Sequence, residues 1–118
     1  MVDNSPATKK FQKEMNAGTS SLVLLNVLSR SKEPMYGYQI AKLLEESGPD
    51  FPMMKQGTLY PVLRSLEENG LLSSLVEPSV SGPPRRYYKI TTDGHAAKAE
   101  WLEIWKQIKK FVDANLKG

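Results

Sequence analysis

Apolar residues recur at helical spacing in the first half of the chain. One such pattern predicts a helix at residues 9–31, which the segment Ser-Lys-Glu-Pro at 31–34 ends. A second pattern predicts a helix at residues 36–47, which Gly48-Pro49 stops. A third predicts a helix that Asn69-Gly70 closes, with an inner stripe made of Leu59, Val62, Leu63 and Leu66. Three short helices therefore precede any strand.

The second half of the first helix, residues 22–28, is apolar around nearly its whole circumference. In so short a chain this pattern requires burial against two surfaces, of which one is the chain's own core. We expect the other surface to belong to a partner subunit that Leu22 and Leu24 contact.

Two runs suited to β-strands follow, at residues 71–76 and 85–91, and a turn-rich segment too long for a two-residue hairpin separates them. Side chains alternate along the second run, so we expect Tyr88 and Ile90 to be buried. On the same argument Arg85, Tyr87 and Lys89 point outward. The two runs predict a small β-hairpin, or wing.

The chain ends in a further helical pattern that reaches about Leu116. Thr91 or Thr92 can cap its first turn, where Asp93 complements the positive end of the helix dipole. Its apolar residues recur every three or four positions, at Ala97, Trp101, Trp105, Ile108, Val112 and Leu116. One small core cannot cover this stripe, so we expect a second copy of the chain to pack on it, contacting Trp101, Trp105, Ile108, Val112 and Leu116.

Composition narrows the classes of function. The chain has 118 residues, 40% of them apolar and 25% charged, as expected for one folded domain. It has no Cys and a single His, His95, so disulfides and thiolate zinc sites are excluded and we expect no metal or other cofactor. No carboxylate pair, His or Ser is placed by a motif for catalysis, and we expect no enzyme. The lack of a membrane-length apolar run or a secretory leader predicts a cytoplasmic protein with no membrane partner.

Two segments of the chain, whose net charge is +3, carry cations and no acids. Residues 55–66 contain Lys55 and Arg64, and residues 82–92 contain Arg85, Arg86 and Lys89. Such segments are typical of a surface that faces phosphate.

The order of three helices, a two-stranded wing and a last helix is that of a winged helix-turn-helix. We therefore predict a mainly α fold with a small β wing, divided into a flexible tail at 1–8, a DNA-binding domain at 9–91 and a C-terminal dimerisation helix at 92–118. The predicted DNA contacts lie on the third helix, at the start of the second and on the wing, at Tyr38, Gln39, Lys55, Thr58, Tyr60, Arg64, Arg85, Arg86 and Lys89. Arg64 could instead pair with Glu67 or Glu68 one turn away.

Several motifs in a fixed order carry a resemblance to a known family. They are Tyr36-Gly37-Tyr38-Gln39-Ile40, Gly57-Thr58-Leu59-Tyr60-Pro61-Val62-Leu63-Arg64-Ser65-Leu66-Glu67, Gly70-Leu71-Leu72, Gly82-Pro83-Pro84-Arg85-Arg86-Tyr87-Tyr88-Lys89-Ile90-Thr91, and Gly94. Over about residues 18–105 the chain resembles the PadR family of bacterial transcriptional regulators. The resemblance implies a homodimeric winged-helix repressor that leaves its pseudo-palindromic operator DNA when a small molecule binds.

The short chain resembles the smaller subfamily, which has a single C-terminal helix. There the dimer interface can enclose a pocket in which aromatic side chains sandwich flat, drug-like molecules. Trp105 matches the pocket tryptophan, and the resemblance implies an effector pocket lined also by Val23, Val27 and Trp101. A closed dimer core without a ligand is the alternative.

The chain departs from the family pattern at three positions. Lys55 stands where a capping Ser or Asn is common, and Ser65 stands where a second basic residue is common. Pro61 either lies in the first turn of a helix that begins at Thr58 or disturbs a longer helix. A MarR-like winged-helix regulator without a ligand pocket and a DNA-free protein-interaction module remain as alternative functions.

Overall fold

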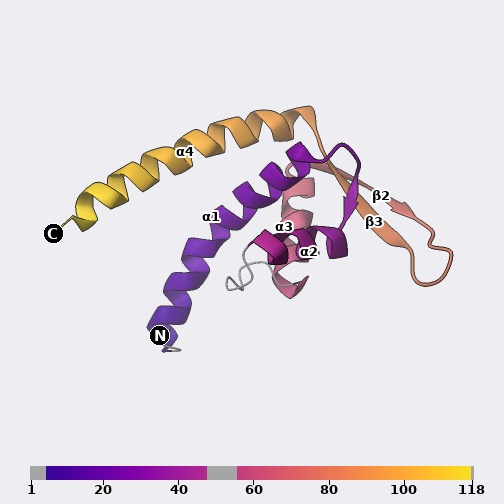
Figure 1. Cartoon of the computed structure of the whole chain (residues 1–118), viewed down its shortest axis with the longest axis horizontal. Helices are drawn as coiled ribbons and strands as arrows, with labels where there is room; N and C mark the ends of the chain where they lie inside the picture. Colours follow the sequence, from indigo (N-terminus) through magenta and orange to yellow (C-terminus); the bar gives the residue numbers. More distant parts are fainter. Residues whose placement is uncertain (1–4, 48–55, 118) are drawn as a thin grey trace.

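Four helices and a small antiparallel sheet make up the fold (Figure 1). The structure is a computed structural model that describes residues 5–47 and 56–117. In chain order the elements are α1 (Pro6–Arg30), β1 (Met35–Tyr36), α2 (Gly37–Ser47), α3 (Gln56–Glu68), β2 (Leu72–Glu77), β3 (Arg85–Ile90) and α4 (Thr92–Leu116). This arrangement confirms the predicted winged helix-turn-helix with one added C-terminal helix.

Helix α1 begins at Pro6, three residues before the predicted start. The hydroxyl of Ser5 accepts a hydrogen bond from the amide of Thr8 at 3.2 Å, and Pro6 follows this cap in the first helical turn. Proline is favoured there because its missing amide would have no helical partner anyway. Residues 6–8, which the sequence assigned to a flexible tail, are therefore helical.

A two-residue strand, β1, lies where the sequence predicted the start of the second helix. Met35 pairs with Tyr88 and Tyr36 with Tyr87, so that β3 is the central strand of the order β1-β3-β2. Tyr36 is consequently part of the sheet, and α2 begins one residue later, at Gly37. This pairing attaches the start of α2 directly to the wing.

The end of α3 and the start of α4 are both built by local capping. Gly70 has a φ of +77°, its amide donates to the carbonyl of Glu67 at 2.9 Å, and the amide of Leu71 donates to Leu66 at 3.0 Å. This is a Schellman motif, and it ends the helix where Asn69-Gly70 predicted an end. Thr91 caps α4 by accepting from the amide of Gly94 at 3.0 Å, and its hydroxyl donates to the carbonyl of Gly70 at 2.8 Å. The helix-turn-helix and α4 are thereby joined through a few residues.

Helix α3 starts at Gln56 and continues through Pro61. The interpretation that the helix begins at Thr58, with Pro61 in its first turn, is therefore wrong. Because proline has no amide hydrogen, the carbonyl of Gly57 lacks its usual helical partner. Lys55, predicted as a DNA contact, lies outside the described residues.

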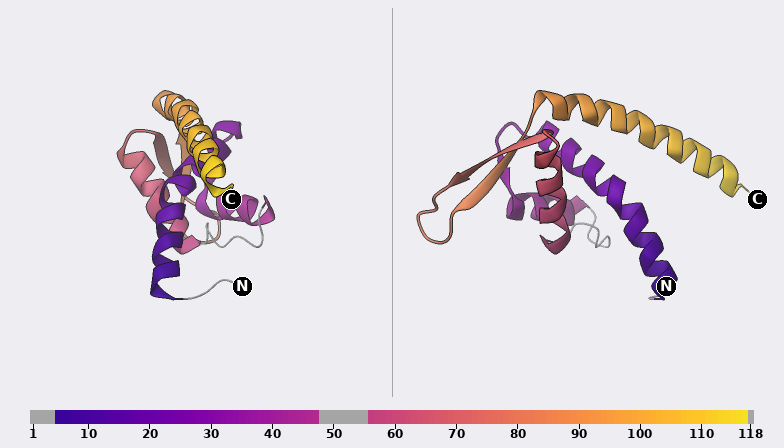
Figure 2. Two further views of the ribbon diagram at one scale, coloured as in Figure 1. Left: turned by 90° about the vertical axis from the view of Figure 1, so that its left-hand side faces the viewer. Right: turned by 180° about the vertical axis from the view of Figure 1, so that it is seen from behind.

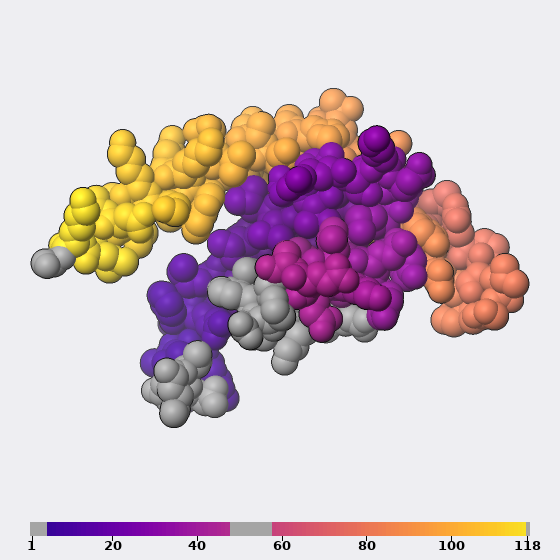
Figure 3. Space-filling view, viewed as in Figure 1, coloured from indigo at the N-terminus to yellow at the C-terminus, as the bar shows by residue number. Residues whose placement is uncertain are grey.

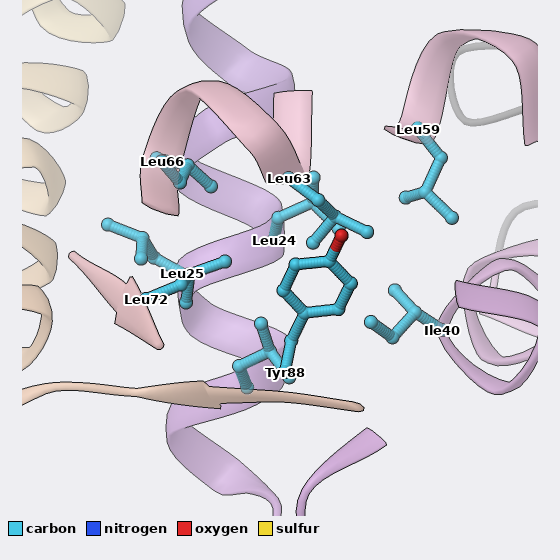
Figure 4. Close-up of a cluster of buried hydrophobic side chains, with 9 residues drawn as sticks. Leu24, Leu25, Ile40, Leu59, Leu63, Leu66, Leu72 and Tyr88 are labelled. Atoms are coloured by element: carbon cyan, nitrogen blue, oxygen red, sulfur yellow. The ribbon is translucent and has the colours of Figure 1, made fainter. Parts of the chain in front are cut away.

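The core lies where α1, α2, α3 and the sheet meet (Figure 4). Its buried members are Leu24, Leu25, Leu28, Ile40, Leu59, Leu63, Leu66, Leu72 and Tyr88. Figure 4 shows the ring of Tyr88 reaching from β3 toward Leu63 of α3. Leu24, expected at a dimer interface, is completely enclosed in this core and offers a partner no surface. The apolar circumference of α1 could not indicate which side faces its own chain.

Helices α1 and α4 contact one another near the core and then diverge (Figure 1). The radius of gyration is 16.0 Å, whereas a compact domain of this length would have about 13.5 Å. Figure 3 shows the C-terminal half of α4 standing clear of the rest of the chain. From residue 102 onward the apolar side chains of α4 are exposed, namely Leu102, Ile104, Trp105, Ile108, Phe111, Val112 and Leu116. The wing extends from the opposite end of the molecule (Figure 2).

Candidate nucleic-acid interface

A groove of about 930 Å³ lies between α3, the start of α2 and the wing. Helix α3 contributes Tyr60, Arg64, Glu67 and Glu68, and the residues before and within α2 contribute Tyr36 and Tyr38. The wing contributes Ser79, Ser81, Gly82, Pro83, Pro84, Arg85, Arg86 and Tyr88. Five of the predicted DNA contacts, Tyr38, Tyr60, Arg64, Arg85 and Arg86, thus lie around one surface.

Helix α3 presents one face to the core and the other to this groove. Leu59 and Leu63 have no exposed surface and Leu66 is 3% exposed, as their helical spacing predicted. Tyr60 and Arg64, one turn apart, are exposed on the outer side, and Thr58 is exposed at the start of the helix. Burial of the leucine stripe therefore fixes which side chains a ligand can reach.

The ring of Tyr60 lies directly over Gly37, the first residue of α2. A Cβ atom at Gly37 would collide with the ring and would stand 2.6 Å from the Tyr60 hydroxyl oxygen. The φ of Gly37 is not in the left-handed region, so close approach rather than backbone conformation requires glycine here. This contact joins two of the sequence motifs in space, one at the start of α2 and one on α3.

Tyr36 connects the wing with the start of α2. The guanidinium carbon of Arg85 lies 4.5 Å from the centre of the Tyr36 ring, within range of a cation–π interaction. The Tyr36 ring meets that of Tyr87 edge-on, with centroids 5.4 Å apart, and stacks with Tyr38 at 6.4 Å. Sequence reasoning placed Tyr36 in a helix because a two-residue strand has no periodicity of its own.

Arg86 is connected to α3 through a hydroxyl group. Its Nη1 donates to Ser74 Oγ at 2.8 Å, and the same hydroxyl donates to a carboxylate oxygen of Glu67. Glu67 and Glu68 bring negative charge into a groove that holds three arginines. The two hydrogen bonds that link Arg86 to Glu67 through Ser74 partly offset the negative charge of Glu67. Ser74 and Glu67 were not predicted as site residues, because tertiary structure brings them to Arg86. The register of β2 against β3 places Ser74 opposite Tyr88, two residues from Arg86, and the packing of α3 on β2 brings Glu67 to Ser74.

Two further predicted contacts, Gln39 and Lys89, are exposed at the start of α2 and on the wing but do not line this groove. The Gln39 side-chain oxygen accepts a hydrogen bond from the amide of Tyr36 at 3.1 Å, as in a capping box at the start of α2. Only its amide nitrogen is left to donate outward. Lys89 lines a separate hollow together with Glu33 and Glu77, and is not among the residues of the main groove.

Tyr88 lies at the inner wall of the groove and is only 5% exposed. Burial raises the pKa of its phenol above the ordinary value of 10.0, and the negative charge of Glu67 adds to this effect. Arg86 and Arg64 act on the pKa in the opposite direction. The phenol therefore remains neutral at physiological pH. The charge of the groove comes from its arginines and its two acids.

A second, apolar groove of about 440 Å³ lies between α1 and α4. Its apolar walls are formed by Met15 and Leu22 of α1 and by Trp101, Ile104, Trp105 and Ile108 of α4. Trp101 packs partly against the core, whereas Trp105 is 36% exposed. Val23 and Val27, expected to line an effector pocket, are not among the lining residues. They follow Leu22 on other sides of the same helix.

Within residues 5–47 and 56–117, no three acidic or histidine side chains lie close enough to hold a metal ion. In the same part of the chain, no helix combines the length and the apolar character that a membrane span needs.

Comparison with known proteins places these features in context. A family model described as the transcriptional regulator PadR-like family matches residues 24–100. A PadR family transcriptional regulator from Eggerthella lenta is 32% identical with a TM-score of 0.77, and the match covers 94% of this chain and 93% of that one. A PadR-like transcription factor from Bacteroides fragilis is also 32% identical, with a TM-score of 0.71 and coverage of 89% and 97%. A transcriptional regulator from Clostridium thermocellum is 27% identical, with a TM-score of 0.78 and coverage of 88% and 99%.

Proposed function

The chain belongs to the PadR-like family of transcriptional regulators, and we propose that it is a homodimeric repressor that a small aromatic molecule releases from operator DNA. The family and the winged-helix fold support DNA-binding regulation. Repression, dimerisation, the effector and the contacting residues are the parts that we propose. The observation that carries the proposal is the groove in which α3, α2 and the wing bring together Tyr38, Tyr60, Arg64, Arg85 and Arg86.

In the proposed complex, α3 binds in the major groove. The major groove of B-form DNA is about 12 Å wide and accepts one helix. The exposed side of α3 offers a guanidinium for guanine or phosphate at Arg64 and a hydroxyl group at Tyr60. The wing arginines would reach the neighbouring phosphates. Thr58 at the start of α3 and the side-chain amide of Gln39 are additional donors near the backbone of the DNA.

A second copy of the chain is the proposed cover for the exposed apolar stripe of α4. Removing Trp105, Ile108, Val112 and Leu116 from water would require a partner with a matching apolar face, and an identical α4 with the start of α1 provides one. A two-fold dimer would place its two α3 helices on successive major grooves, with half-site centres about 10 base pairs apart. This spacing favours a pseudo-palindromic operator.

Binding to DNA is tested with the duplex upstream of the gene itself, by fluorescence anisotropy over a range of salt concentrations. We expect Arg64→Ala and Arg85→Ala to weaken binding, and loss of a pure phosphate contact should flatten the salt dependence by about 1 in the log–log slope. Lys110→Ala is the matched control, because it removes an exposed cation from α4, remote from the groove. Equal affinity of all these variants and the wild type would contradict the proposed interface.

Repression is tested by transcription in vitro from the same upstream DNA. We expect added protein to lower transcript yield, and Arg64→Ala to restore it. Increased yield with the wild-type protein would identify an activator and contradict the repressor role.

The proposed effector would bind in the groove between α1 and α4. A flat aromatic molecule stacked on Trp105 would gain about 0.5–1.5 kcal/mol per ring pair beyond area burial and should quench tryptophan fluorescence. We expect micromolar binding of at least one compound from a panel of planar dyes and phenolic acids, accompanied by release of DNA. Trp105→Ala should abolish this response, whereas Leu102→Ala, on the same helix but not in the groove, should retain it. If no compound changes the fluorescence or the DNA binding of the wild type, the groove between α1 and α4 has a structural role only.

A further inference from the structure

We propose that Tyr36 is a positioning residue that holds the guanidinium of Arg85 in place for contact with a DNA phosphate. The inference rests on the proposed function, and it assigns a task to a side chain outside the predicted set of DNA contacts. Tyr36 lies on β1, between α1 and the helix-turn-helix, and its ring touches side chains from the wing and from α2.

The position of the Tyr36 ring is determined from several directions. Its backbone is paired with Tyr87 in the sheet, and the two rings meet edge-on at an interplanar angle of 67° with centroids 5.4 Å apart. On α2, the ring of Tyr38 stacks with it at an angle of 17°. The Tyr36 amide is bound by the side chain of Gln39 at 3.1 Å. The ring is therefore a fixed platform rather than a mobile surface side chain.

Arg85 lies over this platform, with its guanidinium carbon 4.5 Å from the ring centre. Arginine has a long side chain with many rotamers, and ordering it on DNA reduces affinity unless it is already ordered in the free protein. A planar guanidinium on an aromatic face is ordered in this way and keeps its edge free for phosphate oxygens. At an exposed site such an interaction corresponds to about a two- to fivefold change in an equilibrium constant.

The same contact aligns two parts of the DNA-binding surface. Arg85 is the first residue of β3, where the strand meets the loop of the wing. Two of the residues that hold Tyr36, namely Tyr38 and Gln39, are at the start of α2, whose first residue lies under Tyr60 of α3. A wing arginine bound to Tyr36 consequently has a defined distance to α3. A purely structural Tyr36 would contribute to stability but would have no specific energetic coupling to Arg85 in DNA binding.

A double-mutant cycle with the full-length protein and the upstream duplex tests the coupling. We expect Tyr36→Leu to weaken DNA binding about two- to fivefold and to add less than about twofold in the Arg85→Ala background. Tyr36→Phe keeps the aromatic face and should bind as the wild type does. Independent, multiplicative effects of Tyr36→Leu and Arg85→Ala would overturn the inference while leaving Arg85 as a DNA contact. No effect of Arg85→Ala would overturn it as well, and Arg64→Ala would then decide the proposed function separately.

An NMR measurement on the free wild-type protein tests the geometry without DNA and needs no variant. Protons of the Arg85 side chain above an aromatic ring should show upfield ring-current shifts. Tyr36→Phe should retain these shifts, and Arg85→Lys should weaken DNA binding because lysine lacks the planar group. Ordinary random-coil shifts for the Arg85 side chain in the wild type would overturn the proposal.

Discussion

Replacing Gly37 by Ala tests the contact between α2 and α3 that orients Tyr60. In an ordinary helix this exchange stabilises the protein by up to about 1 kcal/mol, because alanine restricts the unfolded chain more than glycine does. At Gly37 the added Cβ would instead collide with the outer part of the Tyr60 ring. The sign of the effect therefore depends on what the ring loses when it moves.

The loss can be worked out from the exposure of Tyr60, which is 41%. A fully enclosed aromatic side chain buries about 150–250 Å², so Tyr60 buries roughly 90–150 Å², equivalent to about 2–4 kcal/mol at 25 cal/mol/Å² as an upper bound. Only the outer half of the ring needs to leave, since the colliding atoms are Cε1, Cζ and the hydroxyl oxygen. About 1–2 kcal/mol is then lost and up to about 1 kcal/mol gained, for a net destabilisation of up to about 2 kcal/mol and about 1 kcal/mol at mid-range.

The assay compares Gly37→Ala in the wild type with Gly37→Ala in a Tyr60→Ala background, by urea unfolding and by DNA binding. Without the ring the added methyl group meets no phenol, so the same exchange should be neutral or stabilising by up to about 1 kcal/mol. DNA binding should fall about as much in Gly37→Ala as in Tyr60→Ala, and the double variant should fall no further. Stabilisation by Gly37→Ala in both backgrounds would refute the close contact.

Three other substitutions test separate parts of the structure. Gly94→Ala should reduce the free energy of unfolding by about 1–3 kcal/mol or more and so lower the melting temperature. The added Cβ would collide with the backbone carbonyl of Leu71, which cannot move aside as a side chain can. An unchanged melting curve would contradict this. The raised pKa of Tyr88 predicts unfolding free energy that is unaffected below about pH 10 and falls as the pH rises through the folded pKa. Tyr88→Phe should show a shallower alkaline decline, and equal declines would argue against it. Ser74→Ala should weaken DNA binding a few-fold through Arg86 while changing stability by less than about 1 kcal/mol; wild-type affinity would show that the hydroxyl does not position the guanidinium.

Local sequence signals were sufficient for most of the elements. The leucine spacing on α3 predicted which side is buried, Asn69-Gly70 predicted the end of that helix, and Thr91 was one of two expected caps of α4. These features depend on residues within one or two turns of each other. The order of the motifs also identified the PadR family correctly, because each motif corresponds to one of these local elements. Prediction was less accurate at the start of α1, where the capping signal of Ser5 and Pro6 was overlooked.

Tertiary structure decided how the elements meet. The pairing of β1 with β3 joins residues some fifty positions apart. A strand of two residues is too short to show the alternation of apolar and polar side chains from which a strand is predicted. For the same reason, only the folded chain places Arg85 over Tyr36 and Ser74 between Arg86 and Glu67. Apolar character along α1 likewise indicated that two sides would be covered, without showing which. Packing enclosed Leu24 in the chain's own core and turned Leu22 toward the groove with α4, because burial is a property of the whole assembly of elements and not of one helix.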